Sequence, residues 1–331
     1  MRPSIKACEA RREGAPRRRW CGDWISFESH PFSRTEGRAH RDLRSALTDG
    51  NVRRVSTRPR GILFVDLDGT LVGADGIADR VWPALAALRE AGFRIAVCTG
   101  RPGRGIALDV ARRVDPDGLH VFESGAVVMH ASGEVLVHHA LPGRAVNDIV
   151  AAGVAAGATL ECYSADARYL VRERNLLISD HERLLGFAAE VVAWPPVVPL
   201  VRMQWVLLHE EWPRLQAAAR EVLNEVEAHE GHSPRMPGVS FVSMTAPGVS
   251  KATGVRVVLE RLGIDRADAA MAGDNYNDID AFGAVGTVFV PLDGVVEALA
   301  LADYVIPSAT AGGVAEAAEI LLARVGRPVL R

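Results

Sequence analysis

The sequence has little cysteine and no apolar run long enough to cross a membrane. Its 331 residues include only four cysteines, none close to another in the sequence: Cys8, Cys21, Cys98 and Cys162. This pattern excludes a disulfide framework and a Cys-x-x-Cys metal site, and it favours a reducing cytoplasm as the location of the protein. A membrane helix needs roughly 20 consecutive apolar residues. The longest apolar runs fall well short of that length, so we expect no membrane partner.

The net charge is also small, at −3, but it is unevenly distributed. Residues 1–60 contain 15 Lys and Arg against 7 Asp and Glu, a formal charge of +8, which leaves −11 for the remainder. An acidic body argues against nucleic acid as the main partner. We therefore expect no nucleic-acid partner, and a monomer or a small homo-oligomer.

Residues 1–58 differ from the rest of the chain. They are rich in Arg and lack sustained hydrophobic periodicity, and no apolar segment follows Arg19 to complete a signal peptide. The pattern predicts a disordered extension that joins no core. The alternatives are a start site assigned too early and a nucleic-acid-binding arm, although Asp and Glu interrupt the basic residues of such an arm.

Two common nucleotide-binding patterns are absent. Gly100, Gly103 and Gly105 follow the wrong order for the dinucleotide fingerprint Gly-x-Gly-x-x-Gly. No Walker-type Gly-x-x-x-x-Gly-Lys occurs anywhere in the chain. We interpret the three glycines as local turn residues.

The most informative stretch that is present is residues 61–70, Gly-Ile-Leu-Phe-Val-Asp-Leu-Asp-Gly-Thr. Its apolar start predicts a strand buried on both faces, and Asp66 and Asp68 follow at the end of that strand, where open α/β sheets bind ligands. In a β-like turn the first and third residues point the same way, so the two carboxylates can address one reacting group. One can attack a phosphorus atom while the other supplies and removes protons.

Other interpretations of this stretch are weaker. A calcium loop requires Gly in place of Leu71 and Glu in place of Ile77, so the stretch does not fit one. A receiver-type phosphoacceptor does not need the second aspartate. A solvated turn after a strand remains open on this motif alone.

Strands and helices alternate on both sides of a central insertion, which predicts a parallel sheet with right-handed crossovers. We assign residues 59–124 and 246–331 to this α/β domain. Between them, residues 125–245 combine a hairpin with further strands and helices, which is typical of an α+β layer with an antiparallel sheet. The predicted fold class is therefore α/β, a Rossmann-like parallel-sheet core with an inserted α+β cap.

Three further motifs stand at ends of predicted strands or starts of predicted helices. Thr99 follows the second strand, where its hydroxyl and nearby backbone N–H groups can hold phosphoryl oxygens. Lys251 opens a helix, and its ammonium can neutralise a carboxylate and a phosphate. Residues 273–278, Gly-Asp-Asn-Tyr-Asn-Asp, offer the carboxylates and amides that a hard cation such as Mg²⁺ prefers. Alone, each has a plain alternative: a strand-end threonine, a surface lysine and an acidic turn.

Together, in this order, the four motifs resemble those of the haloacid dehalogenase (HAD) phosphatase superfamily. The position of the insertion, between the second and third motifs, resembles the Cof-type branch, and the likeness covers about residues 60–325. The resemblance implies an Mg²⁺-dependent phosphatase of a small phosphorylated metabolite, a sugar or polyol phosphate. The alternatives are a phosphomutase and a non-catalytic phosphosugar-binding regulator, and the presence of both aspartates argues against the regulator.

The resemblance also implies roles for individual residues. Asp66 is the nucleophile that forms an aspartyl-phosphate, and Asp68 is the general acid and base. The phosphoryl group is held by Thr99 and Lys251. The implied Mg²⁺ ligands and supports are Asp66, the main-chain carbonyl of Asp68, Asp274, Asn277 and Asp278. Substrate contacts are expected at Gly69, Thr70, Gly100 and Arg101.

The inserted module is expected to select the substrate. Because side chains alternate across a strand, Arg168 and Arg172 share one face of their predicted strand. Arg202 and Gln204 share one face of another, opposite an apolar face of Met203, Trp205 and Leu207. We expect the apolar face to pack on helices and the four polar side chains to face Asp66. A solvated outer face is the alternative.

Two segments depart from expected patterns. Family members often carry Asn-Gly-Ala where this chain has Ser124-Gly125-Ala126, which changes a contact to the substrate or to the cap hinge. Residues 229–232, His-Glu-Gly-His, have the wrong spacing for a zinc-binding helix and lie beside a Gly- and Pro-rich loop. We expect solvated or core roles for their side chains rather than metal binding.

Overall fold

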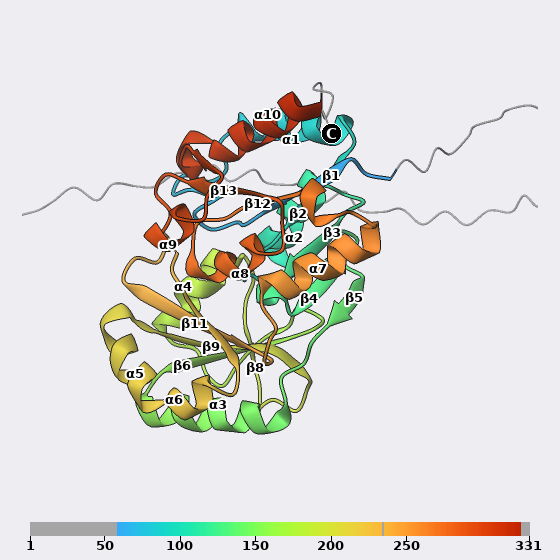
Figure 1. Ribbon diagram of the computed structural model, residues 1–331. Helices are drawn as coiled ribbons and strands as arrows, with labels where there is room; N and C mark the ends of the chain where they lie inside the picture. The colour runs from blue at the N-terminus through green and yellow to red at the C-terminus, as the bar shows by residue number, and fades with distance from the viewer. Residues whose placement is uncertain (1–57, 234, 326–331) are drawn as a thin grey trace, which may run out of the picture. The chain divides into compact units, whose positions relative to one another are not determined.

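The computed structural model describes residues 58–233 and 235–325 (Figure 1). The predicted extension, residues 1–58, lies outside these ranges except for Arg58, and so do Cys8 and Cys21. Within the described ranges, no helix is both long enough and apolar enough to cross a membrane.

The first of two regions, the core, is built on five parallel strands in the order β14-β13-β12-β1-β2. β1 is central: Phe64 lies opposite Ala96 of β2 and Met271 of β12. All five residues of β1 are buried, as expected of a strand covered on both faces. This sheet confirms the predicted fold class. The strands are β1 Gly61–Val65, β2 Phe93–Val97, β12 Ala269–Ala272, β13 Thr287–Pro291 and β14 Tyr304–Ile306.

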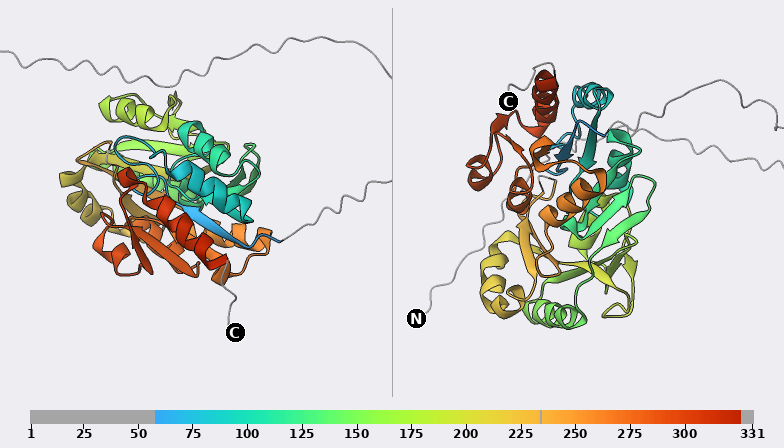
Figure 2. Two further views of the ribbon diagram at one scale, coloured as in Figure 1. Left: turned by 90° about the horizontal axis from the view of Figure 1, so that it is seen from above. Right: turned by 45° about the vertical axis from the view of Figure 1, so that its right-hand side comes forward.

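Helices cover both faces of the core sheet because side chains alternate across β1. Leu63 and Val65 pack with residues of α1, α2 and α10, whereas Ile62 and Phe64 pack with residues of α7, α8 and α9. Figures 1 and 2 show α1 and α10 side by side. The helices are α1 Val81–Glu90, α2 Gly105–Val114, α7 Lys251–Leu262, α8 Ile279–Phe282, α9 Val296–Leu299 and α10 Gly313–Val325.

A small antiparallel sheet, in the order β3-β4-β5, adjoins the end of β2 through a bridge between Cys98 and Val121. Its strands are β3 Leu119–Phe122, β4 Val127–His130 and β5 Val135–His138. The sequence analysis placed the β4–β5 hairpin in the inserted module, but the hairpin pairs with β3. The boundaries of that module, 125 and 245, remain a proposal.

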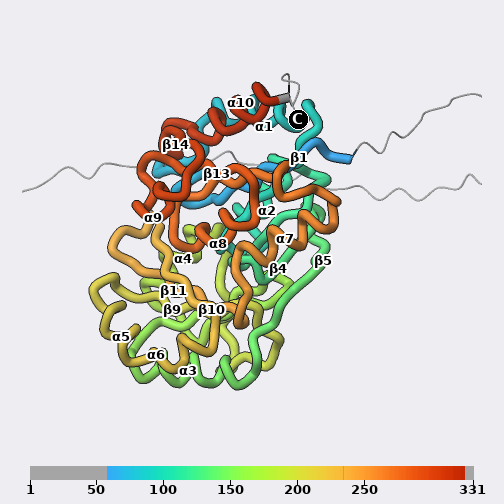
Figure 3. Tube along the Cα trace, viewed as in Figure 1, coloured from blue at the N-terminus to red at the C-terminus, as the bar shows by residue number. Residues whose placement is uncertain are grey.

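The second region, which we call the cap, is built on six strands in the order β10-β11-β9-β6-β7-β8. Neighbouring strands are antiparallel except β7 and β8. The chain passes from core to cap between β5 and α3 and returns between β11 and α7 (Figure 3). The strands are β6 Thr159–Ser164, β7 Tyr169–Val171, β8 Glu190–Val191, β9 Leu200–Leu208, β10 Glu227–Gly231 and β11 Val239–Thr245.

The two faces of the cap sheet carry different helices. Met203, Trp205 and Leu207 pack with residues of α3, α5 and α6, as the alternation of β9 predicts. On the other face, α4 packs on Tyr163 and Tyr169. The helices are α3 Gly143–Ala156, α4 Leu176–Leu185, α5 Trp212–Ala218 and α6 Arg220–Leu223.

The sequence analysis did not predict one strand of the cap. Residues 229–231, expected beside a loop, lie in β10 at the edge of the sheet. An edge strand pairs on one side only and needs little hydrophobic alternation, which explains why the polar sequence Glu-Ala-His-Glu-Gly gave no strand signal.

Candidate active site

Four charged side chains converge where β1 and β12 end and α7 begins. The Nζ atom of Lys251 lies 2.8 Å from Oδ1 of Asp66 and 2.6 Å from Oδ1 of Asp278. Carboxylate oxygens of Asp66, Asp274 and Asp278 all lie within 4.8 Å of one another. The hydroxyl of Thr70 donates to Oδ1 of Asp274 at 2.7 Å. In this acidic cluster, one ammonium therefore faces three carboxylates.

The charge imbalance perturbs the protonation of the cluster. Burial raises the pKa of Asp66 to about 7, with Lys251 opposing the rise and Asp278 adding to it. Burial and repulsion from Asp66 and Asp278 raise the pKa of Asp274 well above its ordinary value. Burial acts to lower the pKa of Lys251, but the neighbouring carboxylates outweigh it and the pKa is raised. The cluster thus favours a further cation, and its oxygen donors suit a hard divalent ion.

Asp68 stands outside this cluster and pairs with Arg101. The guanidinium Nε and Nη2 atoms donate to the two carboxylate oxygens at 2.7 and 2.5 Å. The remaining Nη1 donates to the carbonyl of Leu184 in α4 at 3.0 Å, so Arg101 links core and cap. Burial acts to raise the pKa of Asp68, but the charge and hydrogen bonds of Arg101 outweigh it and the pKa is lowered. Two aspartates two residues apart therefore have opposite pKa shifts.

At two positions of the site, a neighbouring segment lies so close to the backbone that only glycine fits. Gly69 has a φ of 85°, and a Cβ atom there would lie 2.3 Å from Oδ2 of Asp274. A Cβ atom on Gly125 would lie 1.9 Å from the carbonyl oxygen of Ser250, beside Lys251. Only glycine lets these motifs come together, because any larger residue would separate the segments that carry the charged groups.

A pocket opens above Asp66 and is lined by both regions. Of the site residues expected from the sequence, eight line it: Asp66, Asp68, Thr99, Gly100, Arg101, Arg202, Gln204 and Asn277. Five further expected site residues do not line the pocket. One is Asp274 of the acidic cluster, and the other four lie against Asp66 or Asp274: Gly69, Thr70, Lys251 and Asp278. The core motifs that the sequence separates by up to about 200 residues thus meet in one place.

The cap wall of the pocket rests on a buried carboxylate, that of Glu161. It accepts hydrogen bonds from the hydroxyls of Tyr163 at 2.7 Å and Tyr169 at 2.5 Å. It also accepts from Nε2 of Gln204 at 2.8 Å and lies 2.8 Å from Nδ1 of His181. Burial acts to raise the pKa of Glu161, but His181 and these hydrogen bonds outweigh it and the pKa is lowered. The sequence analysis missed this network.

Arg202 is part of the same wall and is already paired. Its Nε atom donates to Oε2 of Glu123 at 2.6 Å, and both side chains are buried. Its guanidinium lies 3.9 Å from the ring centre of Tyr163 and donates to Gln204 and Ser243. Burial raises the pKa of Glu123 to about 6 despite Arg202, while the pKa of Arg202 is also raised. We take the pair as charged at neutral pH, because a guanidinium does not lose its proton.

The structure corrects the expectation for Arg168 and Arg172. Neither is among the residues that line the pocket. The Nη2 atom of Arg168 lies 2.8 Å from Glu190, and Arg172 is exposed. Their face of β7 also carries Leu170, which packs toward the helices, whereas Tyr169 occupies the face toward Glu161. The expected alternation is present, but the hydroxyl-bearing aromatic side chain takes the inner face.

Ser124, where the family often has Asn, lies in the left-handed backbone region with a φ of 55° and a ψ of 33°. Its N–H donates to the carbonyl of Thr99 at 3.1 Å. Asn is more frequent than Ser in this conformation. Ser124 therefore occupies a backbone conformation that favours Asn, irrespective of any substrate contact.

Comparisons with known proteins agree with this arrangement. A family profile described as haloacid dehalogenase-like hydrolase matches residues 63–317. The HMP-PP phosphatase of Escherichia coli O157:H7 is 24% identical over 228 residues, which cover 68% of this chain and 81% of that protein.

Two solved structures share the fold. A haloacid dehalogenase-like hydrolase from Bacteroides thetaiotaomicron superposes with a TM-score of 0.68 at 21% identity, covering 79% of this chain and 99% of that one. A sugar phosphatase of HAD subclass IIB superposes with a TM-score of 0.67 at 22% identity, covering 78% and 98%. The chain belongs to the haloacid dehalogenase-like hydrolase family, and its resemblance to the Cof-type phosphatases of that family is confirmed.

Proposed function

We propose that this chain is an Mg²⁺-dependent phosphoric monoester hydrolase that acts on a small phosphorylated metabolite, a sugar or polyol phosphate. One observation carries the proposal: two aspartates open to the same pocket in opposite electrostatic environments. Asp66 lies beside Lys251 in the acidic cluster, whereas Asp68 stands outside it and pairs with Arg101. Carboxylates separated in this way suit a nucleophile and a general acid–base.

The chemistry we propose uses both aspartates in turn. A carboxylate oxygen of Asp66 attacks the phosphorus, and an aspartyl-phosphate forms as the bond to the leaving oxygen breaks. Asp68 gives a proton to that oxygen and then takes one from the water that hydrolyses the intermediate. Lys251 and the hydroxyl of Thr99 stabilise the charge on the phosphoryl oxygens. Because Asp68 must carry a proton for the first step, its pairing with Arg101 has to loosen when substrate binds.

The acidic cluster fits a divalent ion, and Mg²⁺ is the ion we propose. The carboxylates of Asp66 and Asp274 and the main-chain carbonyl of Asp68 would hold it. The Nζ atom of Lys251 donates to Asn277 at 3.2 Å and to Asp278 at 2.6 Å, so these two residues hold the ammonium in place beside Asp66. When bound, Mg²⁺ supplies positive charge that offsets the repulsion between a phosphate and a carboxylate.

The cap wall supports a polyhydroxylated substrate. Gln204, Ser243 and His229 line the pocket opposite Asp66 and offer hydrogen-bonding groups suited to hydroxyls. Arg202 is bound to Glu123, so we assign it the positioning of Gln204 and Ser243 rather than direct contact. The similar proteins that are named as phosphatases, one of them a sugar phosphatase, support the same substrate class.

We also propose a reducing cytoplasm as the location. Among the described residues, Cys98 and Cys162 are buried free thiols. Burial raises the pKa of both thiols, so neither is poised as a nucleophile. Both observations are compatible with a compartment that keeps thiols reduced.

The test is phosphate release from a panel of phosphorylated metabolites and from a generic aryl phosphate. Asp66→Asn keeps the shape of the side chain but removes its nucleophilic charge, so turnover should fall by at least about 10³-fold. Asp68→Asn should allow slow phosphorylation of Asp66 and block its hydrolysis, which leaves a trapped phospho-protein. Near-native turnover by Asp66→Asn contradicts the mechanism. Transfer of the phosphoryl group without release indicates a phosphomutase, and binding without turnover indicates a regulator.

A further inference from the structure

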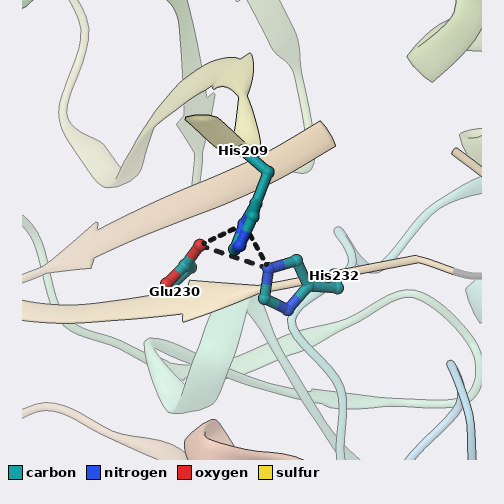
Figure 4. Close-up of side chains that lie close together, drawn as sticks. All are labelled: His209, Glu230 and His232. Carbon is teal, nitrogen blue, oxygen red and sulfur yellow. Dashed lines mark hydrogen bonds and ion pairs between the residues drawn. The ribbon is translucent and has the colours of Figure 1, made fainter. Parts of the chain in front are cut away.

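Three potential metal ligands, none of them part of the acidic cluster, converge at one end of the cap sheet (Figure 4). His209 follows the last residue of β9, Glu230 lies in β10, and His232 comes just after β10. The Nδ1 atom of His209 lies 3.3 Å from Oε1 of Glu230, and Nε2 of His232 lies 3.2 Å from the same oxygen. The two nitrogens are 3.3 Å apart. These atoms form a nearly equilateral triangle.

The size of this triangle matches one face of a tetrahedral metal site. Zinc binds imidazole nitrogen and carboxylate oxygen at about 2.0–2.1 Å, and a tetrahedron's edge is about 1.63 times its centre-to-corner distance, so neighbouring ligand atoms lie about 3.3–3.4 Å apart. All three observed distances fall at or just below this value.

Hydrogen bonds join some of these atoms already. Nδ1 of His209 lies 3.0 Å from the hydroxyl oxygen of Ser240, and the same hydroxyl donates to Glu230. Each neutral imidazole has only one N–H proton to donate, whereas a single cation in front of the three atoms can bind all of them at once.

Neighbouring groups already hold the ligands in place. The hydroxyl of Ser240 in β11 donates to Oε1 of Glu230 at 2.6 Å, as outer contacts of metal ligands often do. The backbone N–H of His209 donates to the carbonyl of Gly238 at 2.9 Å. The side chains of His209, Glu230 and His232 are 61%, 22% and 41% exposed, so an ion can enter and a water can complete the coordination.

We propose that His209, Glu230 and His232 bind a borderline transition-metal ion, with Zn²⁺ as the representative, at a site separate from the acidic cluster. Two imidazoles and one carboxylate favour such an ion over Mg²⁺, which prefers oxygen donors alone. The ion ties the end of β9 to β10, across the start of β11. Because Gly231, His232 and Ser233 border the pocket, the bound ion also fixes that part of the pocket rim.

A second group nearby fits less well and serves as a control. His229 lies 3.3 Å from Glu227 and 4.0 Å from Asp280, which is too long for a tetrahedral edge. His229 is one residue from Glu230, but neighbouring residues of a strand point to opposite faces. His229→Ala therefore removes a nearby imidazole without removing a proposed ligand.

The experiment titrates Co²⁺ into the metal-stripped full-length chain in the presence of excess Mg²⁺, which occupies the acidic cluster. The wild type and His229→Ala should bind one tetrahedral Co²⁺ per chain, seen by its visible absorption bands, and Zn²⁺ should displace it. His209→Ala and His232→Ala should each weaken this binding by at least about 100-fold, and Ser240→Ala by about tenfold. Metal bound by residues 1–57, which contain Cys8 and Cys21, would persist in all of these variants.

Thermal unfolding separates loss of the site from loss of the fold. Without metal, the variants should melt close to the wild type. Zn²⁺ should raise the Tm of the wild type and of His229→Ala, should raise that of Ser240→Ala only at higher concentration, and should leave that of His209→Ala and His232→Ala unchanged. The proposal is overturned if the wild type binds no tetrahedral Co²⁺, if binding survives in both His209→Ala and His232→Ala, or if it is lost in His229→Ala. Loss of phosphatase activity in Asp66→Asn is independent of all these outcomes.

Discussion

Core and cap both bury carboxylates at the pocket, but they balance the charge in different ways. In the acidic cluster, Asp66, Asp274 and Asp278 share the single ammonium of Lys251, and the pKa values of Asp66 and Asp274 are raised. In the cap, Glu161 receives hydrogen bonds from several donors of its own, and its pKa is lowered.

This difference assigns two separate roles: the acidic cluster provides the reactive groups, and the Glu161 network fixes the shape of the pocket. The acidic cluster is incompletely neutralised, so its lowest free energy requires a ligand such as a cation. The Glu161 network satisfies its own charge, so it keeps its geometry whether or not a ligand is present. The reacting centre is therefore the part of the pocket most sensitive to pH and metal, and the cap wall is the part that gives the pocket a fixed form.

The largest expected effect is on the pH dependence of stability without metal. In the folded chain Asp66 has a pKa of about 7, against an ordinary value of 3.8. Between these values the folded state holds a proton that the unfolded state has lost. The contribution of this proton to the free energy of unfolding is complete below about pH 4 and is lost as the pH rises through about 7. The free energy of unfolding should fall by roughly 4 kcal/mol over this range.

Urea unfolding in chelator from about pH 5 to pH 8 measures this slope. Asp66→Asn should reduce it, and Mg²⁺ should flatten the wild-type curve because a bound cation favours the ionised form. Parallel curves for the wild type and Asp66→Asn would show that the pKa of Asp66 is not raised in the folded state. The acidic cluster and the Glu161 network would then not differ in how their charges are balanced.

The next effect compares two amide substitutions of opposite sign. Glu161→Gln turns an amide N–H₂ group toward existing donors. The free energy of unfolding, measured in chelator, should therefore fall by about 2–4 kcal/mol. Asp274→Asn removes a repelled carboxylate, so metal-free stability should stay within about 1 kcal/mol of the wild type or rise. Phosphate release should be lost in Asp274→Asn. If both variants lose the same stability, the two regions do not differ as described.

The smallest effect concerns the link between the regions. Arg101→Lys keeps a positive charge but loses the fork that binds both oxygens of Asp68 and the carbonyl of Leu184. The pKa of Asp68 should rise, so the alkaline limb of kcat/KM should move to higher pH. Arg104→Lys, at an exposed position three residues away, is the matched control and should leave the profile unchanged. An identical profile for Arg101→Lys argues that Arg101 does not set the protonation of Asp68.

The core site could be predicted from the sequence because each motif follows a recognisable element. The apolar run before Asp66 identifies a buried strand, and parallel strands end at the same edge of a sheet. Thr99, Lys251 and residues 273–278 follow similar signals, so their meeting could be expected without any distance information. Gly69 was expected near the substrate, but only the structure shows that it makes room for Asp274.

The cap site could not be predicted to the same extent, because strand alternation does not tell which face is turned inward. Arg168 and Arg172 share a face as expected, but Tyr169 takes the inner face with Glu161. The position of Glu161 between Leu160 and Cys162 was the available signal, since a lone charge in an apolar strand needs partners. The meeting of His209 and Glu230 also depends on β11 lying between β9 and β10, an order that no local pattern contains.

The place of β1 in the core sheet also has a consequence for how the chain folds. Ile62 pairs on one side with Arg94 of β2 and on the other with Ala269 of β12, about 200 residues further along. The entropy cost of closing a loop grows only with the logarithm of its length, so inserting the cap changes equilibrium stability little. Pairs this distant in sequence nevertheless slow folding. On the ribosome, one edge of β1 therefore stays open until the cap has been synthesised, and during that interval the chain is most exposed to aggregation.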